Sequence, residues 1–312
     1  MERERPDLAS QSDRPVADFY NSGFVAVKPT PLSFDVFTLS RDIASKKTGC
    51  NDQEALNMAI RELQRQKSGL NAALLDERLF MSGYKYFEQA NHLLPRADDP
   101  CSSNNRINCT VLVVHHNWLS SMEAKIYRFR EHLMWLYDGE NGYYTSRTRK
   151  YLTYSNSKPS ASMHVAKRQV STLRTALSIA YLLKRVVILP RFYCNADRFD
   201  CPLSSLIQMK LFDAYFSNRY RESSFLQHPR VPRVVKRGVS YRPITSMPYN
   251  PNTMTIDNLV IQLQNSDDKV INIGELDGIR TSNHSFGTAF DERIRKAFRL
   301  CSYNQLEPGE LL

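Results

Sequence analysis

Two adjacent histidines, His115 and His116, end the apolar run VLVVHH (111–116) and precede Asn117 and Trp118. The run predicts a buried strand. Neighbouring side chains of a strand point to opposite faces, so at most one imidazole faces a given cleft. Ligands collect at the carboxyl ends of strands in α/β sheets, and a neutral imidazole there can bind a metal. The alternative is structural: one histidine packs in the core and the other caps the following helix.

Lys125 lies in the helix predicted after these histidines. Apolar residues recur three and four positions apart over 119–136, and Ser120 with Glu123 has the pattern of a capping box. Lys125 is therefore early in the helix, where a cation is unfavourable unless an anion is bound. A phosphate at the helix start would explain the lysine. The alternative is an exposed lysine tolerated at small cost.

A strand is predicted over 18–28, and Asn21, Ser22 and Gly23 interrupt it. A glycine within a strand allows close approach of the backbone to a ligand, or it simply marks a β-bulge. Both interpretations place this tripeptide at an irregular point of a sheet, where a binding site can form.

Asp52 and Gln53 open a helix predicted over 52–67. Asn51 is the expected N-cap, and Glu54 stands at the capping-box position. An acid at this place could contact a ligand. It is also expected without any function, because a carboxylate is stabilised by the positive amino end of a helix dipole.

Composition and charge restrict the class of protein. With 312 residues, 42% hydrophobic and 11% aromatic, the chain is too apolar to be disordered throughout and long enough for two domains. The N-terminus is charged, and no apolar run reaches the roughly 18 residues of a membrane span. The formal net charge is +10, with seven basic residues and one acid in 219–242. That segment predicts a solvated basic face or a polyanion surface. Nucleic-acid binding through this segment is a further alternative that rests on its charge and interleaved aromatic residues alone, and nucleic acid is not among the expected partners.

The six cysteines contain no Cys-x-x-Cys pair, so they do not indicate a zinc site of the usual spacing. An even number permits disulfides. Two glycosylation sequons begin at Asn108 and Asn283, which would suit a secretory compartment.

The order of elements predicts an α/β fold. Further helices are expected over 32–47, 164–185 and 255–264, and each of the last two leads into a short apolar strand, VVILP or KVINIGEL. A helix joined directly to a buried strand is typical of Rossmann-like units. A polar, tyrosine-rich stretch near 140–160 is the expected boundary between domains 1–145 and 146–312.

Three motifs in order, YNSGFVAVKPTP, CNDQEALNMAI and VVHHNWLSSMEAKIYRFRE, resemble the nucleotide-diphospho-sugar transferase family, which includes plant cell-wall xylosyl- and arabinosyltransferases. The resemblance covers roughly residues 15–136. It implies the C-terminal part of a GT-A-like nucleotide-sugar transferase domain, followed by a second Rossmann-like α/β domain. The segments TLRTALSIAYLLKRVVILPRFYCNADRFDCPLSSLI and YRESSFLQHPRVP resemble the region behind this domain in the arabinosyltransferase-like branch.

The resemblance also implies roles for individual residues. His115 matches the histidine that completes a divalent-metal site, for Mn²⁺ or Mg²⁺, while His116 falls on a variable position. Asp52 and Gln53 would face the transferred sugar or the acceptor and act in catalysis. The remaining matched residues would bind the nucleotide-sugar donor: Asn21, Ser22, Gly23, Asn117, Trp118 and Lys125.

The implied activity is metal-assisted transfer of a sugar, such as arabinose or xylose, to a glycan or glycoprotein acceptor. Two departures from the family pattern are present: Ser121 replaces a glycine, and no Asp-x-Asp motif precedes the Asn-Ser-Gly strand. The chain is therefore expected to be a fragment of a longer Golgi enzyme, with the membrane anchor outside it. The alternative is a non-catalytic glycan-binding or scaffold protein of the same descent.

Overall fold

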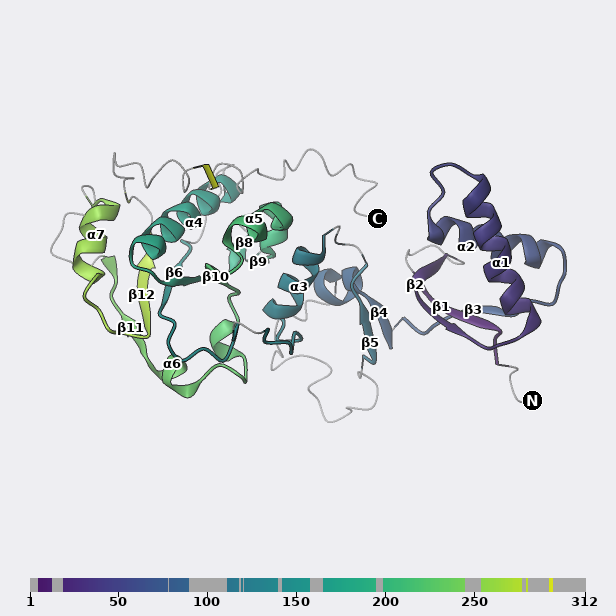
Figure 1. The fold of residues 1–312 in the computed structure, drawn as a ribbon, viewed down its shortest axis with the longest axis horizontal. Coiled ribbons are helices and arrows are strands. Elements are labelled where there is room, and N and C mark those ends of the chain that lie inside the picture. Colours follow the sequence, from purple (N-terminus) through teal and green to yellow (C-terminus); the bar gives the residue numbers. More distant parts are fainter. Residues whose placement is uncertain are drawn as a thin grey trace. The chain divides into compact units, whose positions relative to one another are not determined.

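The computed structural model describes residues 5–12, 19–77, 79–89, 111–117, 119, 121–139, 142–157, 165–194, 199–244, 254–276, 279 and 292–293. Contacts divide the chain into two compact units, which we call unit 1 (residues 1–120) and unit 2 (residues 121–311). Figure 1 shows the elements of each. Strands and helices occur in both units, which confirms the predicted α/β class.

Unit 1 contains a three-stranded sheet in the order β2-β1-β3. The central strand β1 (Leu8–Ser12) is buried along its whole length, pairs antiparallel with β2 (Tyr20–Val27) and parallel with β3 (Ala72–Leu74). Two helices pack together, α1 (Pro31–Lys46) and α2 (Asp52–Arg65), and α2 also contacts β2. The core that joins helices to sheet is apolar and includes Leu8, Tyr20, Val36, Leu56 and Ile60.

Local sequence signals explain where these helices begin. Thr30 caps α1 in a reciprocal capping box with Ser33, and Pro31 occupies the first turn. Asn51 is the N-cap of α2, as predicted, because its side chain accepts a hydrogen bond from the backbone N–H of Glu54. One side chain of α2 reaches the edge of the sheet: the Asn57 amide accepts from Tyr20 N at 2.9 Å and donates to Tyr20 O at 2.7 Å.

A second strand pair completes unit 1. Strands β4 (Phe80–Ser82) and β5 (Val113–His115) are parallel, and a short π-helical turn (Lys85–Gln89) follows β4. The sequence correctly predicts β5 within 111–116. His116, directly after β5, is buried, and its ring lies 4.7 Å from that of Phe87.

Unit 2 is built on a five-stranded parallel sheet in the order β10-β7-β6-β12-β11. The strands are β6 (Tyr151–Ser155), β7 (Val186–Ile188), β10 (Tyr220–Arg221), β11 (Val239–Tyr241) and β12 (Val270–Glu275). The helices are α3 (Met122–Glu131), α4 (Val165–Leu182), α5 (Met209–Phe216), α6 (Arg233–Arg237) and α7 (Ile256–Leu263). Helix α4 packs on β6 and β7 (Figure 1), so the predicted helix-into-strand units α4–β7 and α7–β12 are confirmed.

The helix after the two histidines differs from expectation in three respects. Its N-cap is Ser121, whose hydroxyl accepts from the Ala124 N–H, and not Ser120. It ends at Glu131, because Leu133 takes a positive φ of 58° that stops the helix. Helix α3 contacts α5 and belongs to unit 2, so the contacts divide the chain at 120/121, whereas the expected domain boundary at 145/146 falls inside unit 2.

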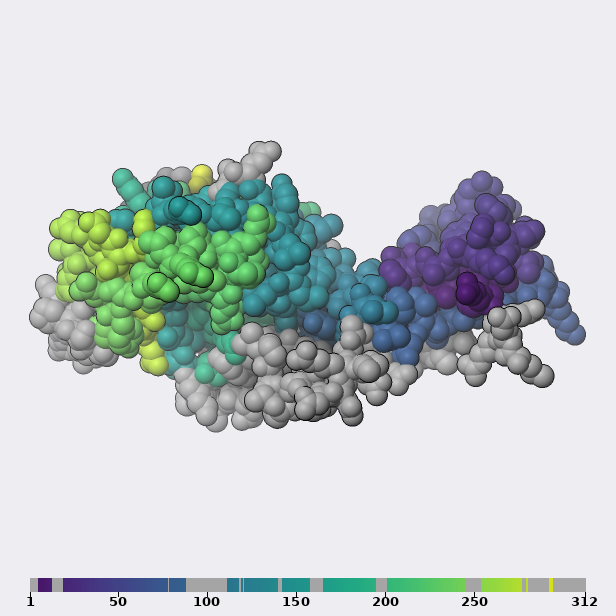
Figure 2. Space-filling model, turned by 90° about the horizontal axis from the view of Figure 1, so that it is seen from below, coloured from purple at the N-terminus to yellow at the C-terminus, as the bar shows by residue number. Residues whose placement is uncertain are grey.

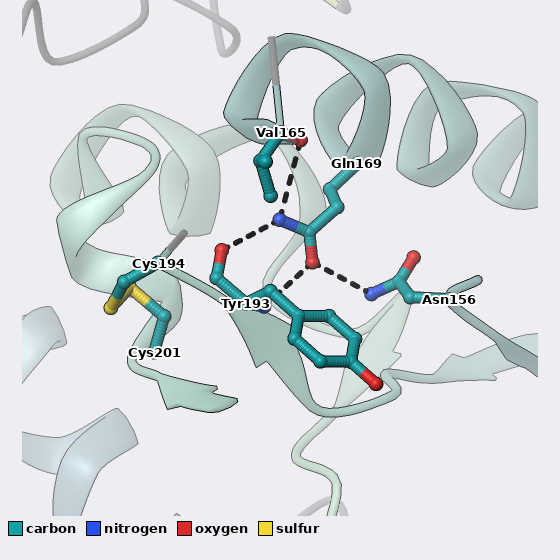
Figure 3. The surroundings of a disulfide bond; sticks show 6 residues. All are labelled: Asn156, Val165, Gln169, Tyr193, Cys194 and Cys201. Atoms are coloured by element: carbon teal, nitrogen blue, oxygen red, sulfur yellow. Dashed lines mark hydrogen bonds between the residues drawn. A yellow bond between two sulfur atoms is a disulfide. The ribbon is translucent and has the colours of Figure 1, made fainter. Parts of the chain in front are cut away.

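A short hairpin follows β7. Strands β8 (Phe192–Tyr193) and β9 (Phe199–Cys201) are antiparallel, and the Cys194–Cys201 disulfide closes the loop between them (Figure 3). Gln169 of α4 anchors this hairpin, because its amide donates to Tyr193 O and accepts from Tyr193 N, each at 2.7 Å. The disulfide agrees with the expectation that an even set of cysteines permits pairing. Cys50 is a free thiol, and Cys101, Cys109, Cys301 and both sequons lie outside the described residues.

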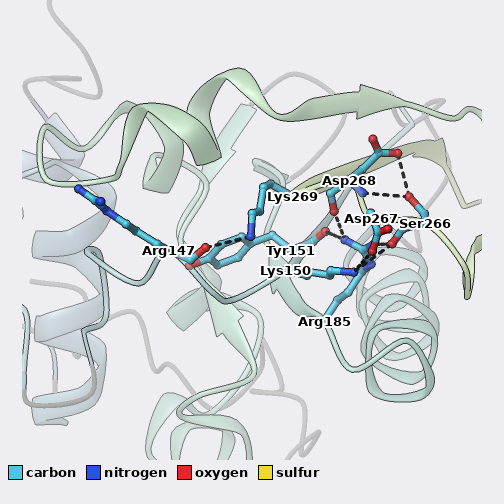
Figure 4. Close-up of polar contacts among 8 residues, drawn as sticks. All are labelled: Arg147, Lys150, Tyr151, Arg185, Ser266, Asp267, Asp268 and Lys269. Carbon is cyan, nitrogen blue, oxygen red and sulfur yellow. Dashed lines mark hydrogen bonds and ion pairs between the residues drawn. The ribbon is translucent and has the colours of Figure 1, made fainter.

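Arg185, just before β7, joins the start of β6 to the loop before β12. Its side chain is 3% exposed and donates to the carbonyl oxygens of Tyr151, Ser266 and Asp268 at 3.2, 2.7 and 2.7 Å (Figure 4). Lys150 makes a more exposed contact nearby, with Asp267 at 3.0 Å. The basic residue before β7 thus ties the start of β6 and β7 to the loop before β12.

The basic segment 219–242 does not form one uniform face. Arg221 is fully buried, whereas Arg233 and Arg237 lie on α6, a short helix at the surface. Figure 2 shows residues of this part of the sequence, in green, on one face of unit 2. The prediction of a solvated basic face therefore fits α6, but Arg221 belongs to the core.

A carboxyl group is buried beside Arg221. Glu222 is 0% exposed, and its Oε2 accepts a hydrogen bond of 2.6 Å from the Tyr143 hydroxyl. Burial raises the pKa of Glu222 above its usual value, because the charged form loses its hydration. The folded protein therefore holds this proton to a higher pH than the unfolded chain does.

Glu222 should accordingly make stability fall as pH rises. Its contribution to the free energy of unfolding is present below about pH 4.5, the ordinary pKa, and is lost as pH rises through the raised pKa. Glu222→Gln does not titrate at this position. The difference between its melting temperature and that of wild type, measured by thermal unfolding, should therefore grow in favour of the variant as pH rises from about 4.5 to 8. Glu62→Gln is the control, because exposed Glu62 has a pKa of about 2 and should give a constant difference over this range. Parallel curves for Glu222→Gln and wild type would contradict the expectation.

Candidate functional site

The predicted interruption of the strand by Asn21, Ser22 and Gly23 is a large bulge in β2. Between the paired positions, β1 advances two residues, from Ser10 to Ser12, while β2 covers five, from Val25 back to Tyr20. Asn21 shapes the extra loop, because its Oδ1 accepts a hydrogen bond of 2.7 Å from the Gly23 N–H. The buried Ser10 hydroxyl donates to Asn21 O at 2.7 Å and fixes the loop to β1.

The amino end of α2 holds the bulge from the other side. Asp52 Oδ2 accepts a hydrogen bond of 2.8 Å from the Ser22 hydroxyl, and Gln53 Oε1 accepts one of 3.3 Å from the Ser22 N–H. Both side chains come from the first turn of α2, where their position follows from the Asn51 cap. Asp52 is exposed, so its carboxylate combines this fixed position with access to a ligand.

His115, at the end of β5, lies directly against Gly23. A methyl group added at Gly23 would stand 2.4 Å from His115 Cε1 and 2.7 Å from His115 Nε2. Carbon atoms do not approach so closely, so a side chain at this position would force the imidazole to move, and the glycine leaves the space that the ring occupies beside the bulge. The φ angle of Gly23 is not in the left-handed region.

Gln11 of β1 orients the imidazole. Its Nε2 donates to Phe80 O at 2.9 Å, which directs its Oε1 towards His115 Nδ1, 3.0 Å away. Since that oxygen can only accept, the neutral ring carries its hydrogen on Nδ1 and its lone pair on Nε2. Nε2 is also the ring nitrogen nearest to Gly23.

The structure brings together six of the nine residues predicted for the site. They belong to the bulge, the start of α2 and the end of β5: Asn21, Ser22, Gly23, Asp52, Gln53 and His115. Asn117 follows closely, with its N–H donating to His115 O at 3.0 Å. Trp118 lies outside the described residues, and Lys125 is on α3, in unit 2.

Two polar residues of the site were missed by the sequence analysis, Ser10 and Gln11. Both are buried in β1, at 0% and 1% exposure. The segment LASQS has no motif, and its importance depends on pairing with a strand whose register contains a bulge. Buried hydroxyl and amide groups require hydrogen-bond partners, and here the partners are Asn21, Phe80 and His115.

The described residues fit only part of a metal site. The lone pair on His115 Nε2 is the donor that a divalent cation would use, and Gln11 supplies the supporting hydrogen bond typical of metal-binding histidines. Among the described residues, however, no group of three His, Cys, Asp or Glu side chains could hold an ion. We therefore derive no chemical step through a metal.

The model of the nucleotide-diphospho-sugar transferase family matches residues 3–129, a span that contains the bulge, α2 and β5. Over these residues, which are less than half of its length, the chain is similar to that family. The resemblance predicted from the three sequence motifs is confirmed.

One curated relative extends beyond the transferase region. Arabinosyltransferase XEG113 of Arabidopsis thaliana is 22% identical over 262 residues, which cover 70% of this chain and 39% of the relative. The chain thus spans about two fifths of the length of that protein. No solved structure matches this chain. No helix in the described part of the chain is long and apolar enough to cross a membrane.

Proposed function

We propose that this protein takes part in transferring a sugar from a nucleotide-diphosphate donor to a glycan or glycoprotein acceptor. The observation that carries the proposal is the convergence of the β2 bulge, the start of α2 and the His115 ring in a region of the transferase family. The likeness to an arabinosyltransferase supports a pentose, such as arabinose or xylose, as the transferred sugar. The Golgi is the proposed compartment, which the two glycosylation sequons at Asn108 and Asn283 would suit.

The proposed roles divide between donor binding and catalysis. Asp52, exposed and fixed by Ser22, would accept a hydrogen bond or proton from a sugar hydroxyl, with Gln53 beside it to orient the ring. The donor would contact Asn21, Ser22, Gly23, Asn117 and Trp118. Mn²⁺ or Mg²⁺ is the proposed cofactor, and His115 would be one of the side chains that hold it.

Titration of the purified chain with UDP, with and without Mn²⁺, tests the site. We expect Mn²⁺ to strengthen UDP binding and His115→Ala to weaken it about tenfold or more, because a ligand to the ion is lost. Asp52→Asn should bind UDP normally but release UDP from a UDP-pentose at least about 100-fold more slowly. Asp35→Asn, at an exposed position on α1, is the matched control and should behave as wild type. Unchanged binding in His115→Ala together with unchanged turnover in Asp52→Asn would overturn the proposal.

A second function is favoured by one observation. The described residues hold no complete group of metal ligands, which is what a non-catalytic glycan-binding or scaffold protein of this family would show. That protein would bind glycans and release no UDP from any UDP-sugar, with or without Mn²⁺. The same UDP-release measurement therefore separates the two functions.

A further inference from the structure

Unit 2 contains a pocket that is separate from the bulge and from His115. Its volume is about 190 Å³, and its lining comes from α3, from the loop after it and from α5 and the residues that follow. Lining residues include Arg130, Tyr137, Asp138, Tyr143, Asp213 and Asn218. The volume is below the roughly 300–1,000 Å³ of pockets for drug-sized ligands, so it suits a ligand about as large as one sugar ring.

Arg130 supplies hydrogen-bond donors to this pocket. Its guanidinium carbon lies 3.8 Å from the centroid of the Tyr143 ring, and the Arg221 guanidinium lies 3.9 Å from the same centroid. Within the described part of the chain, the Arg130 guanidinium has no carboxylate or carbonyl partner, and its Nε is buried without one. The terminal N–H groups of the guanidinium, which also make no hydrogen bond to the described residues, are the donors that a ligand oxygen in this pocket can meet.

The acceptors of the pocket are two carboxylates. Asp138 is occupied by the backbone of Tyr144 and the side chain of Thr145, which fix its position. Asp213 Oδ1 accepts a hydrogen bond of 2.7 Å from the Tyr220 hydroxyl. The other carboxylate oxygen, Oδ2, has no partner among the described residues. Two carboxylates against one arginine disfavour a phosphate or an acidic sugar, since like charges at short range repel. A neutral polyol can donate to Asp213 and accept from Arg130 without that penalty.

Tyr137 adds an exposed aromatic ring to these polar groups. It is 68% exposed and lines the pocket, so the face of its ring is accessible to a ligand. The C–H face of a sugar ring is apolar and can stack on such a surface. The aromatic ring suits the apolar C–H face of a sugar, and the free donor and acceptor suit its hydroxyl groups.

We propose that this pocket binds one neutral sugar residue of a glycan. The proposal goes beyond the donor site, because it uses no residue of unit 1 and requires neither metal nor nucleotide. Unit 2 would then recognise a carbohydrate by itself, whether or not the chain catalyses transfer.

Binding of neutral methyl glycosides to the full chain tests this pocket. The probes are methyl α-L-arabinofuranoside, methyl β-D-xylopyranoside and methyl β-D-galactopyranoside. Their binding is measured by saturation-transfer NMR and by calorimetry. We expect saturable binding of at least one probe at millimolar concentration, about tenfold weaker in Tyr137→Ala and in Asp213→Asn. Tyr241→Ala is the matched control, because Tyr241 is 66% exposed on β11 and lines no part of this pocket.

The outcomes separate this proposal from that for the donor site. His115→Ala should bind the glycosides like wild type even if it loses UDP binding. Binding of none of the three probes would overturn the sugar pocket. So would equal affinity in Tyr137→Ala and Asp213→Asn, or tighter binding of glucuronate or inorganic phosphate than of any neutral glycoside.

Discussion

Arg185→Met is expected to lower the free energy of unfolding of unit 2 by about 3–5 kcal/mol. Methionine keeps most of the length and packing of the side chain but removes every donor. Three carbonyl oxygens, of Tyr151, Ser266 and Asp268, then lose a charged hydrogen-bond partner whose own side chain is buried. Each such loss costs roughly 1–3 kcal/mol.

The measurement is urea unfolding followed by circular dichroism. Lys150→Met is the control, since Lys150 contacts the same loop through Asp267 and Ser266 but its side chain is 36% exposed. An exposed ion pair contributes at most about 1 kcal/mol, so the control should be nearly as stable as wild type. If both variants lost the same stability, Arg185 would not be the joint between β6, β7 and the loop before β12.

Gly23→Ala is expected to expel the His115 ring from the bulge and to cost about 1–3 kcal/mol of stability. The added methyl group would lie 2.4 Å from His115 Cε1, and the ring can yield only by leaving its hydrogen bond with Gln11. The same movement would remove Nε2 from the position proposed for the metal. UDP binding in Mn²⁺ should therefore fall in this variant to the level of His115→Ala.

A double-mutant cycle isolates the contact between Gly23 and His115. In a His115→Ala background the ring is absent and only Asn21 Oδ1, 3.1 Å from the added methyl group, remains close, so Gly23→Ala should cost clearly less than in the wild type. Urea unfolding of the four proteins gives the coupling energy, and the His115 ring resonances report its displacement. An identical cost of Gly23→Ala in both backgrounds would show that the methyl group meets something other than the imidazole.

Local patterns were enough to predict most elements near the site. Asn51 marked the start of α2, the apolar run 111–116 marked β5, and Asn21 to Gly23 marked an irregularity in β2. These features follow from capping, hydrophobic run length and glycine, which act within a few residues of the chain. The family motifs then grouped them into one site.

Features that depend on distant pairing were not predictable. Gln11 orients His115 across 104 positions of the sequence, and no local pattern in LASQS indicates this. Glu222 resembled an acid within a basic surface segment, although it is buried under Tyr143. The change of N-cap from Ser120 to Ser121 has a simpler reason: two adjacent serines satisfy the same capping rule, and the backbone decides between them.

Asn57 acts in place of a β-strand. Strand β2 lies at the edge of its sheet, and the Asn57 amide supplies Tyr20 with the donor and acceptor that a neighbouring strand would offer. An incoming strand from another molecule would first have to displace this helix side chain. Exposed edges are the usual starting point of intermolecular sheet growth, so Asn57 protects the irregular end of β2 from aggregation. The bulge can thus remain accessible to a ligand without pairing with strands of other molecules.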